Sequence, residues 1–228
     1  MSMTYEDSLN NTLPRPTPKI PDNVLDNSTS RTNKTEFLSQ RCSVSVLNRQ
    51  CGVSDYKKLQ STLRDIREVF GKIDIVIANA GISILKPLLE QSLDEYHVHM
   101  ATNVHGVIYG ANLISAIFKE QGFGNFIITS SISGVTVPVD HTVYNMTKAA
   151  VTHLGRGLAR EWRDFARVDV VAPGYIETDM SDCPASNGEA RGMAVLGRGG
   201  GGGGGGGVEA SSFVTGAEVT VNGGYTLP

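Results

Sequence analysis

The chain has 228 residues, of which 40% are hydrophobic and 19% charged, a balance typical of a globular protein with enough chain for a sizeable core. The formal net charge of −3 argues against a nucleic-acid-binding protein, because phosphate recognition needs a basic surface. No run approaches the roughly 18 apolar residues that a membrane span needs, and the polar N-terminus has no apolar secretion signal. The three cysteines are odd in number and lack metal-ligand spacing. We therefore expect free thiols, no metal site and a cytoplasmic location.

The first segment of the chain is rich in proline. Residues 13–26, LPRPTPKIPDNVLD, contain four prolines, so we predict that residues 1–26 form an extended arm with little helix or strand. Residues 27–228 are predicted to form a single domain. Inside this domain nine consecutive glycines occupy residues 199–207. They are either a flexible loop or, as we favour, positions whose true side chains are not represented in the sequence.

Helix-like and strand-like segments alternate through the domain. Apolar residues at helical spacing predict a helix over 57–71 that ends at its glycine. The continuous apolar run IDIVIANAG, residues 73–81, predicts a strand that is buried on both faces. Further helices are predicted over 93–120 and 142–165, and further strands in 125–131, 167–174 and 217–224. This alternation predicts an α/β protein of the Rossmann-like, doubly wound kind, with a parallel sheet covered by helices on both faces.

Polar and small residues follow the ends of the predicted strands. Asn79, Ser131 and the pair Pro173 and Gly174 lie at such ends, where parallel sheets bind their ligands. Tyr144 and Lys148 are four residues apart and share one face of a predicted helix. A cation beside a phenol favours the phenolate, so we expect Lys148 to lower the pKa of Tyr144 from its usual value near 10.

Five ordered markers resemble those of the short-chain dehydrogenase/reductase family. They are NAG at 79–81, the asparagine of TNVHG, Ser131, YNMTK at 144–148 and PGYIET at 173–178. The resemblance runs from about Asn27 to the C-terminus. Within the family, NTLPRPTPKIPDNVLD, EWRDFARV and GGYTLP are similar to segments of fungal sorbose reductases, mannitol dehydrogenases and carbonyl reductases. The resemblance implies reversible, NADP(H)-dependent reduction of a small carbonyl or sugar substrate by a homotetramer.

The same resemblance implies four catalytic residues. Tyr144 would be the general acid that protonates the carbonyl oxygen, and Ser131 would donate a hydrogen bond to that oxygen. Lys148 would lower the pKa of Tyr144 and hold the nicotinamide ribose. Asn103 would position a water that connects Lys148 to solvent. His141 is left open between a place in the substrate pocket and an exposed position, and no role is assigned to it.

Cofactor contacts follow from the same markers. Residues 79–81 would flank the adenosine side, and Ile176 and Thr178 would bind the nicotinamide carboxamide. NAD-specific relatives place a carboxylate near the adenine ribose, whereas residues 27–31 contain no acid, so we predict NADPH over NADH with Ser28 and Arg31 at the 2′-phosphate. The full set of predicted contacts is Asn27, Ser28, Arg31, Asn79, Ala80, Gly81, Tyr144, Lys148, Pro173, Gly174, Ile176 and Thr178.

One family feature is missing from the sequence. Asp26 is followed directly by Asn27, where the family has a strand, a glycine-rich phosphate-binding turn, a helix and a second strand. Either residues are omitted between Asp26 and Asn27, which we favour, or the chain is truncated. Omission predicts an unpaired sheet edge beside residues 73–81. Gly52 also lacks the side chain that contacts adenine in the family. The alternative function is that of a non-catalytic relative acting as a binding or subunit-interface protein.

Overall fold

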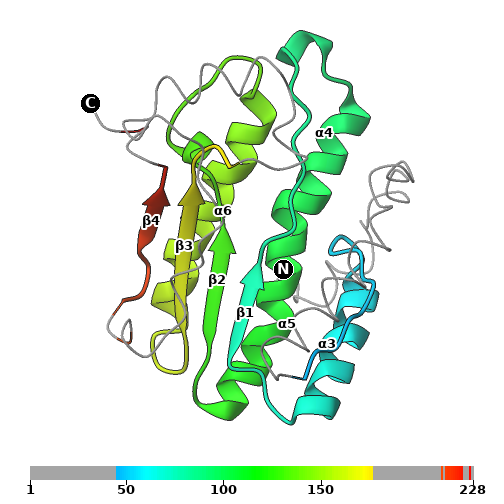
Figure 1. The fold of residues 1–228 in the computed structure, drawn as a ribbon, viewed down its shortest axis with the longest axis vertical. Coiled ribbons are helices and arrows are strands. Elements are labelled where there is room, and N and C mark those ends of the chain that lie inside the picture. Colours follow the sequence, from blue (N-terminus) through cyan, green and yellow to red (C-terminus); the bar gives the residue numbers. More distant parts are fainter. Residues whose placement is uncertain (1–44, 177–211, 213, 223–225, 227–228) are drawn as a thin grey trace, which may run out of the picture.

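The computed structural model describes residues 45–176, 212, 214–222 and 226. The predicted arm 1–26, the loop 27–31, Thr178 and the glycines 199–207 lie outside the described residues. Figure 1 shows the described elements. In chain order they are α3 (Tyr56–Phe70), β1 (Ile75–Ala78), the 3-10 turn η2 (Leu88–Glu90), α4 (Leu93–His99), the π-helical segment η3 (Met100–His105), α5 (Gly106–Gln121), β2 (Asn125–Thr129), the 3-10 turn η4 (Ile132–Gly134), α6 (Thr142–Glu161), β3 (Arg167–Pro173) and β4 (Glu218–Val221).

The described strands form one parallel sheet in the order β1-β2-β3-β4. Helical segments connect β1 to β2 and β2 to β3, as parallel neighbours require. The four strand arrows in Figure 1 all point the same way. This arrangement places the carboxyl ends of the strands at one edge of the sheet. The alternation confirms the Rossmann-like α/β fold that the sequence predicts.

Local signals explain where the helices begin and end. The side chain of Asp55 accepts a hydrogen bond from the backbone N–H of Lys58 at the start of α3, and Gly71 ends that helix with a φ of 79°, which favours glycine. At the start of α4, Ser92 and Glu95 form a reciprocal capping box. Residues 93–121 then run as one helical stretch through η3, as predicted. Segments of π-helix such as η3 are found frequently at functional sites.

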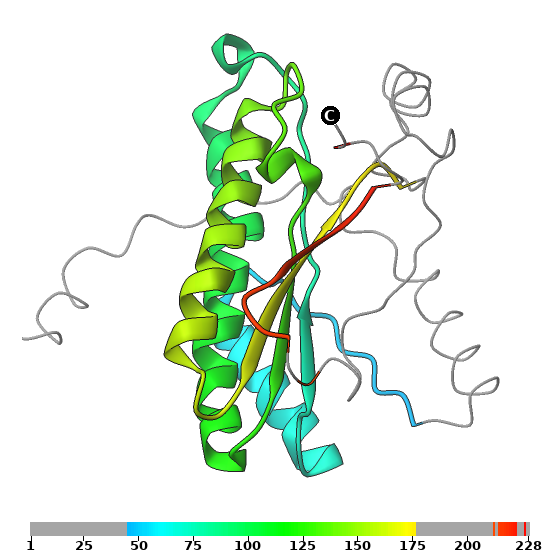
Figure 2. The ribbon, with the colours of Figure 1, turned by 90° about the vertical axis from the view of Figure 1, so that its left-hand side faces the viewer.

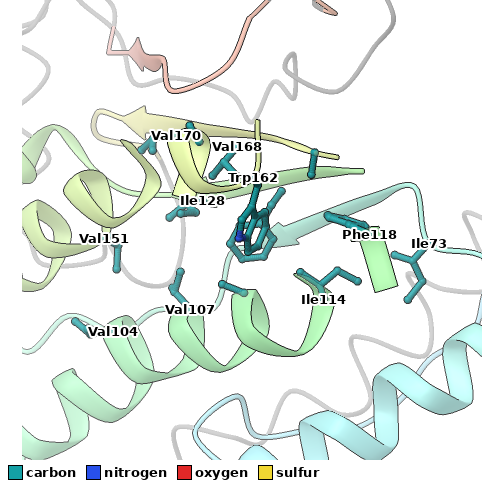
Figure 3. Close-up of a cluster of buried hydrophobic side chains, with 14 residues drawn as sticks. Ile73, Val104, Val107, Ile114, Phe118, Ile128, Val151, Trp162, Val168 and Val170 are labelled. Atoms are coloured by element: carbon teal, nitrogen blue, oxygen red, sulfur yellow. The ribbon is translucent and has the colours of Figure 1, made fainter. Parts of the chain in front are cut away.

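The core lies between the sheet and helices α5 and α6 (Figure 3). The Trp162 ring packs against Phe118 and Phe126, with centroid separations of 6.4 and 5.8 Å. A side chain at Gly155 of α6 would place its Cβ 2.5 Å from Val170 of β3, so glycine permits this close packing of helix and strand. The core therefore fixes α6, which carries the Tyr144–Lys148 pair, against the middle of the sheet.

The second face of the sheet is exposed along β1, whereas Ile127 of β2 on the same face is only 6% exposed. Helices α5 and α6 lie together on one side (Figure 2), and Val76 and Ala78 of β1 pack toward their core. The alternate residues Ile75 and Ile77 are 44% and 59% exposed. The predicted burial of this strand on both faces is therefore wrong, because the helices of the described part of the chain cover only one face. Strand β1 is an edge of the described sheet, as predicted, while the junction of residues 26 and 27 lies outside the described residues.

Within the described ranges, no helix combines the length and the apolar character that crossing a membrane requires.

Candidate functional site

A cleft of about 300 Å³ lies at the carboxyl ends of β1, β2 and β3. Residues that directly follow the three strands meet there, as the sequence predicts for a parallel sheet. Of the predicted site residues, those that line the cleft are Asn79, Gly81, Ser131, Tyr144, Lys148, Pro173, Gly174 and Ile176. Ala80 and Asn103 do not line it, although both belong to the described part of the chain.

Tyr144 and Lys148 lie on one face of α6, as their spacing predicts. The Nζ atom of Lys148 is 5.6 Å from the centre of the Tyr144 ring. The same Nζ donates a hydrogen bond of 2.9 Å to the backbone carbonyl of Thr129, the last residue of β2. Lys148 is only 5% exposed, and this burial lowers its pKa from 10.5 to about 8.

The expected effect of Lys148 on Tyr144 is not found. The pKa of Tyr144 is raised above 10, because burial disfavours the charged phenolate and a hydrogen bond with Ser131 offsets this only in part. The expectation of a lowered tyrosine pKa is therefore wrong for the protein alone. The physical reason is that the cleft desolvates both groups, so each is driven toward its neutral form.

Ser131 is brought beside α6 by the turn η4. Its Oγ accepts a hydrogen bond of 3.1 Å from the backbone N–H of Ser133, and its side chain also hydrogen-bonds Tyr144. A Cβ at Gly134 would lie 3.2 Å from the carbonyl carbon of Lys148, so the absence of a side chain lets η4 approach the helix. Ser130 strengthens this junction, since its hydroxyl donates to the carbonyl of Lys148 at 3.0 Å.

Asn103 lies buried behind the cleft wall, in the π-helical segment η3. Its Oδ1 accepts from the backbone N–H of Ile82 at 2.8 Å. Its Nδ2 donates to the Ile82 carbonyl at 2.9 Å and to Thr147 Oγ1 at 3.1 Å. A Cβ at Gly81 would lie 3.5 Å from both Asn103 Oδ1 and Lys148 Nζ. Asn103 thus holds the segment after β1, and it is close to Lys148 without being bonded to it.

Eight residues in the cleft were not predicted as site residues: Ser83, Leu85, Thr129, Ser130, Ile132, Ser133, His141 and Tyr175. Ser83 and Leu85 alternate with Ile82 and Ile84 in the sequence ISIL, and a period of two marks an extended segment with one face on the cleft. This alternation is the sequence signal from which Ser83 and Leu85 could have been predicted to line the cleft. The ring of His141 is 6.5 Å from that of Tyr144, so the question left open for His141 is resolved in favour of a place in the cleft.

The arrangement suits proton transfer beside a bound dinucleotide. A phenol, a hydroxyl and an ammonium face one cleft, and Gly81 adds no side chain beside Lys148 at its wall. The described residues therefore fit the nicotinamide and ribose end of such a cofactor. Among those residues no glycine-rich turn for the diphosphate is present, and no group of three or more metal-ligating side chains occurs.

Comparison with known proteins gives consistent relatives. Residues 23–201 match the family described as enoyl-(acyl carrier protein) reductase. The chain is 38% identical over 214 residues to a probable NADP-dependent mannitol dehydrogenase of Yarrowia lipolytica, covering 89% of this chain and 77% of that protein. It is 36% identical over 208 residues to a sorbose reductase of Candida albicans, covering 86% and 74%. An NADPH-dependent 3-quinuclidinone reductase from Rhodotorula rubra has a similar structure, with a TM-score of 0.82, 33% identity, and coverage of 89% and 80%.

Proposed function

The chain belongs to the short-chain dehydrogenase/reductase family, and on this premise we propose that it is an oxidoreductase that reduces a ketone or ketose to a secondary alcohol with NADPH. The observation that carries the proposal is the meeting of Ser131, Tyr144 and Lys148 at one cleft. The names of the relatives, NADP-dependent mannitol dehydrogenase and sorbose reductase, support NADP(H) as cofactor and a polyol–ketose pair as substrate.

Proton transfer is the task of Tyr144 and Ser131. The raised pKa of Tyr144 keeps its phenol protonated at neutral pH, which is the state that a general acid needs. The Ser131 hydroxyl, which bonds Tyr144 in the protein alone, would donate to the carbonyl oxygen of a bound substrate and so stabilise the charge that develops there. NADPH, when bound, supplies the hydride to the carbonyl carbon. The phenol proton then completes the alcohol.

Lys148 and Asn103 support this step. The ammonium of Lys148 would stabilise the phenolate that Tyr144 becomes after giving up its proton, and its proximity to the Tyr144 ring supports this role. We expect the same ammonium to bind the ribose hydroxyls. Asn103 Oδ1 accepts one hydrogen bond, from Ile82, and has a second lone pair. That lone pair leaves capacity for the water through which Lys148 would exchange protons with solvent.

Several parts of the proposal rest on the sequence alone. Asn27, Ser28, Arg31 and Thr178 stay predicted cofactor contacts, and the arm 1–26 and the single domain 27–228 stay predictions as well. A homotetramer and a cytoplasmic location are likewise implied by sequence and resemblance. Polar groups in the cleft, among them Ser83 and His141, favour a substrate with hydroxyl groups near the carbonyl over a plain alkyl ketone.

The test is a comparison of binding with turnover. NADPH is titrated into the protein while cofactor fluorescence is followed, and NADPH oxidation is then measured with a panel of ketoses and prochiral ketones. We expect saturable binding and oxidation with at least one ketose. Saturable binding with no oxidation on any member would instead support the non-catalytic relative, and the absence of binding would contradict the proposal altogether.

A further inference from the structure

The segment 82–86 forms one wall of the cleft and is held from behind at alternate residues. Ser83 and Leu85 line the cleft. The alternate residues are hydrogen-bonded to the rest of the protein through their backbone N–H groups. The N–H of Ile82 donates to Asn103 and that of Ile84 to His99. The N–H of Lys86 donates to the backbone carbonyl of Asp140 at 2.9 Å. Side chains that face the cleft therefore alternate with backbone groups that are anchored on the other side.

Asn103 and His99 act as a matched pair of anchors. They are four residues apart on one helical stretch, a rise of about 6 Å along its axis. Ile82 and Ile84 are two residues apart, which spans about 6.6 Å in an extended chain. Because the two spacings agree, Asn103 and His99 on one helix face can accept hydrogen bonds from Ile82 and Ile84 respectively. Asn103 is among the predicted catalytic residues, whereas the sequence analysis gave His99 no role.

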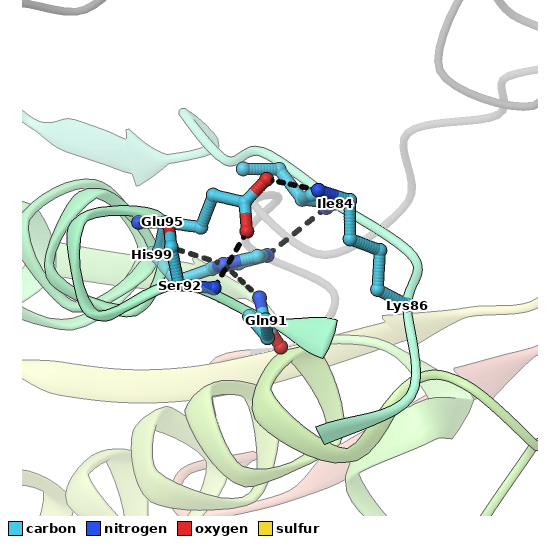
Figure 4. Close-up of polar contacts among 6 residues, drawn as sticks. All are labelled: Ile84, Lys86, Gln91, Ser92, Glu95 and His99. Carbon is cyan, nitrogen blue, oxygen red and sulfur yellow. Dashed lines mark hydrogen bonds and ion pairs between the residues drawn. The ribbon is translucent and has the colours of Figure 1, made fainter. Parts of the chain in front are cut away.

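His99 can make its contacts in only one protonation state. It is completely buried, and the backbone N–H of Ile84 donates to its Nε2 at 3.0 Å (Figure 4). Nε2 must therefore carry no proton. The other nitrogen, Nδ1, lies 3.0 Å from the carbonyl of Glu95, which can only accept, and 3.3 Å from the Gln91 amide. With its proton on Nδ1, the neutral ring accepts from the Ile84 N–H and donates to the Glu95 carbonyl, while the Gln91 NH2, itself a donor, forms no hydrogen bond with Nδ1–H. A charged ring would set its Nε2–H against the Ile84 N–H.

The surroundings of His99 favour that neutral state. Burial lowers its pKa, and the hydrogen bond with the Glu95 backbone and the negative charge of Glu95 oppose this effect only in part. The carboxylate of Glu95 is itself occupied by the Lys86 ammonium at 2.5 Å and the backbone N–H of Ser92 at 2.9 Å. Lys86 and Glu95 are thus the charged groups next to His99, and they neutralise each other.

We propose that His99 is a positioning residue for substrate: as a neutral imidazole it holds Ile84 and thereby sets where Ser83 and Leu85 meet the carbonyl compound in the cleft. The identity of that ligand rests on the proposed function, while the anchoring itself does not. Because the polar contacts of His99 among the described residues are with Ile84, Glu95 and Gln91 and not with Tyr144, Lys148 or Ser131, its loss should affect the binding of substrate more than the binding of NADPH.

Two variants distinguish the hydrogen bond of His99 from the volume of its side chain. His99→Gln keeps an acceptor that can reach the Ile84 N–H, and His99→Leu fills similar space without one. We expect His99→Leu to raise KM for the ketose by at least about tenfold, with the Kd for NADPH within about twofold of wild type. His99→Gln should have a KM for the ketose much closer to that of wild type than His99→Leu has. Equal impairment of the two variants, or an unchanged KM in His99→Leu, would overturn the proposal.

Amide hydrogen exchange at Ile84 gives a readout that needs no substrate. The Ile84 amide should exchange slowly in wild type and His99→Gln, and at least about tenfold faster in His99→Leu, with Phe126 in β2 as an unchanged reference. On acidification, wild type should lose protection at Ile84 while His99→Gln keeps it. Equal exchange in all three proteins would overturn the proposal. This exchange pattern in a wild type that reduces no carbonyl would support the anchor and contradict the proposed function instead.

Discussion

Lys148 shows how a single residue can be kept for chemistry at a cost in stability. It is 5% exposed, and burial lowers its pKa to about 8 while one hydrogen bond to the Thr129 carbonyl partly compensates. No ion pair with a carboxylate of the described residues holds this ammonium, and a buried charge that has lost most of its hydration opposes folding. Such a group is retained when a positive charge is needed at that place, and here the place is beside the Tyr144 ring.

Replacing Lys148 by methionine should therefore stabilise the protein while it removes activity. At pH 7 the lysine is charged in both the folded and the unfolded states, and its lowered pKa of about 8 corresponds to about 3 kcal/mol against folding. Loss of the hydrogen bond to Thr129 returns about 1 kcal/mol. We expect Lys148→Met to raise the free energy of unfolding by about 2 kcal/mol at pH 7, measured by urea denaturation without cofactor.

The pH dependence of this gain follows from the same shift. As pH rises above about 8, folded wild type releases the Lys148 proton while the unfolded chain still holds it, so wild-type stability rises relative to Lys148→Met. The difference in free energy of unfolding between Lys148→Met and wild type should therefore become smaller toward pH 10. A methionine variant that is less stable at pH 7, or a gap that stays constant with pH, would contradict this account of Lys148.

At the scale of elements, the sequence predicts what is local and periodic. Every helix and strand expected between residues 57 and 174 is present, because long apolar repeats and capping residues such as Asp55 and Gly71 mark them. The two-sided burial of β1 was wrong, since an apolar run does not tell how many helices cover a sheet. Tyr144 and Lys148 could be found from their spacing, and Ser131 from its place at a strand end and from the family markers. His99 and the wall at Ser83 could not, because they depend on where an irregular segment meets a helix.

Two isoleucines in neighbouring strands test the one-sided burial directly. Ile128 of β2 is fully buried against α5 and α6, whereas Ile77 of β1 is 59% exposed on the other face. We expect Ile128→Ala to lower the free energy of unfolding by about 2–5 kcal/mol, since it leaves a cavity, and Ile77→Ala to lower it by less than about 1 kcal/mol. Urea denaturation measures both. Similar losses at the two sites would mean that the second face is covered in solution.

At the scale of the whole molecule, the cofactor must reach beyond the described cleft. The nicotinamide end is proposed to lie beside Ser131, Tyr144 and Lys148, which line the cleft, while the loop predicted to bind the adenine end lies outside the described residues. That loop, residues 27–31, has hydroxyl groups, an amide and one arginine, and no carboxylate to repel a 2′-phosphate. The cofactor preference of the chain therefore depends on a region whose role only the sequence indicates.

We expect NADPH to be used with a kcat/KM at least about tenfold higher than that of NADH, because Arg31 can pair with the 2′-phosphate. Arg31→Ala should reduce kcat/KM with NADPH and leave that with NADH nearly unchanged, so the ratio should approach unity. Steady-state kinetics with both cofactors measure this. Comparable efficiencies in wild type would exclude the preference, and an unchanged ratio in Arg31→Ala would exclude Arg31 as its source.

The most direct test of the central claim, that this chain reduces carbonyl compounds through Tyr144, is the turnover of Tyr144→Phe. Removal of the phenol oxygen should lower kcat for NADPH-dependent ketose reduction by about 10²–10⁴-fold, because general acid catalysis is lost, while NADPH binding stays within about twofold. Tyr56→Phe is the matched control, since Tyr56 on α3 bonds Asn112 outside the cleft and should keep full activity. A Tyr144→Phe variant with more than about a tenth of wild-type kcat would contradict the account.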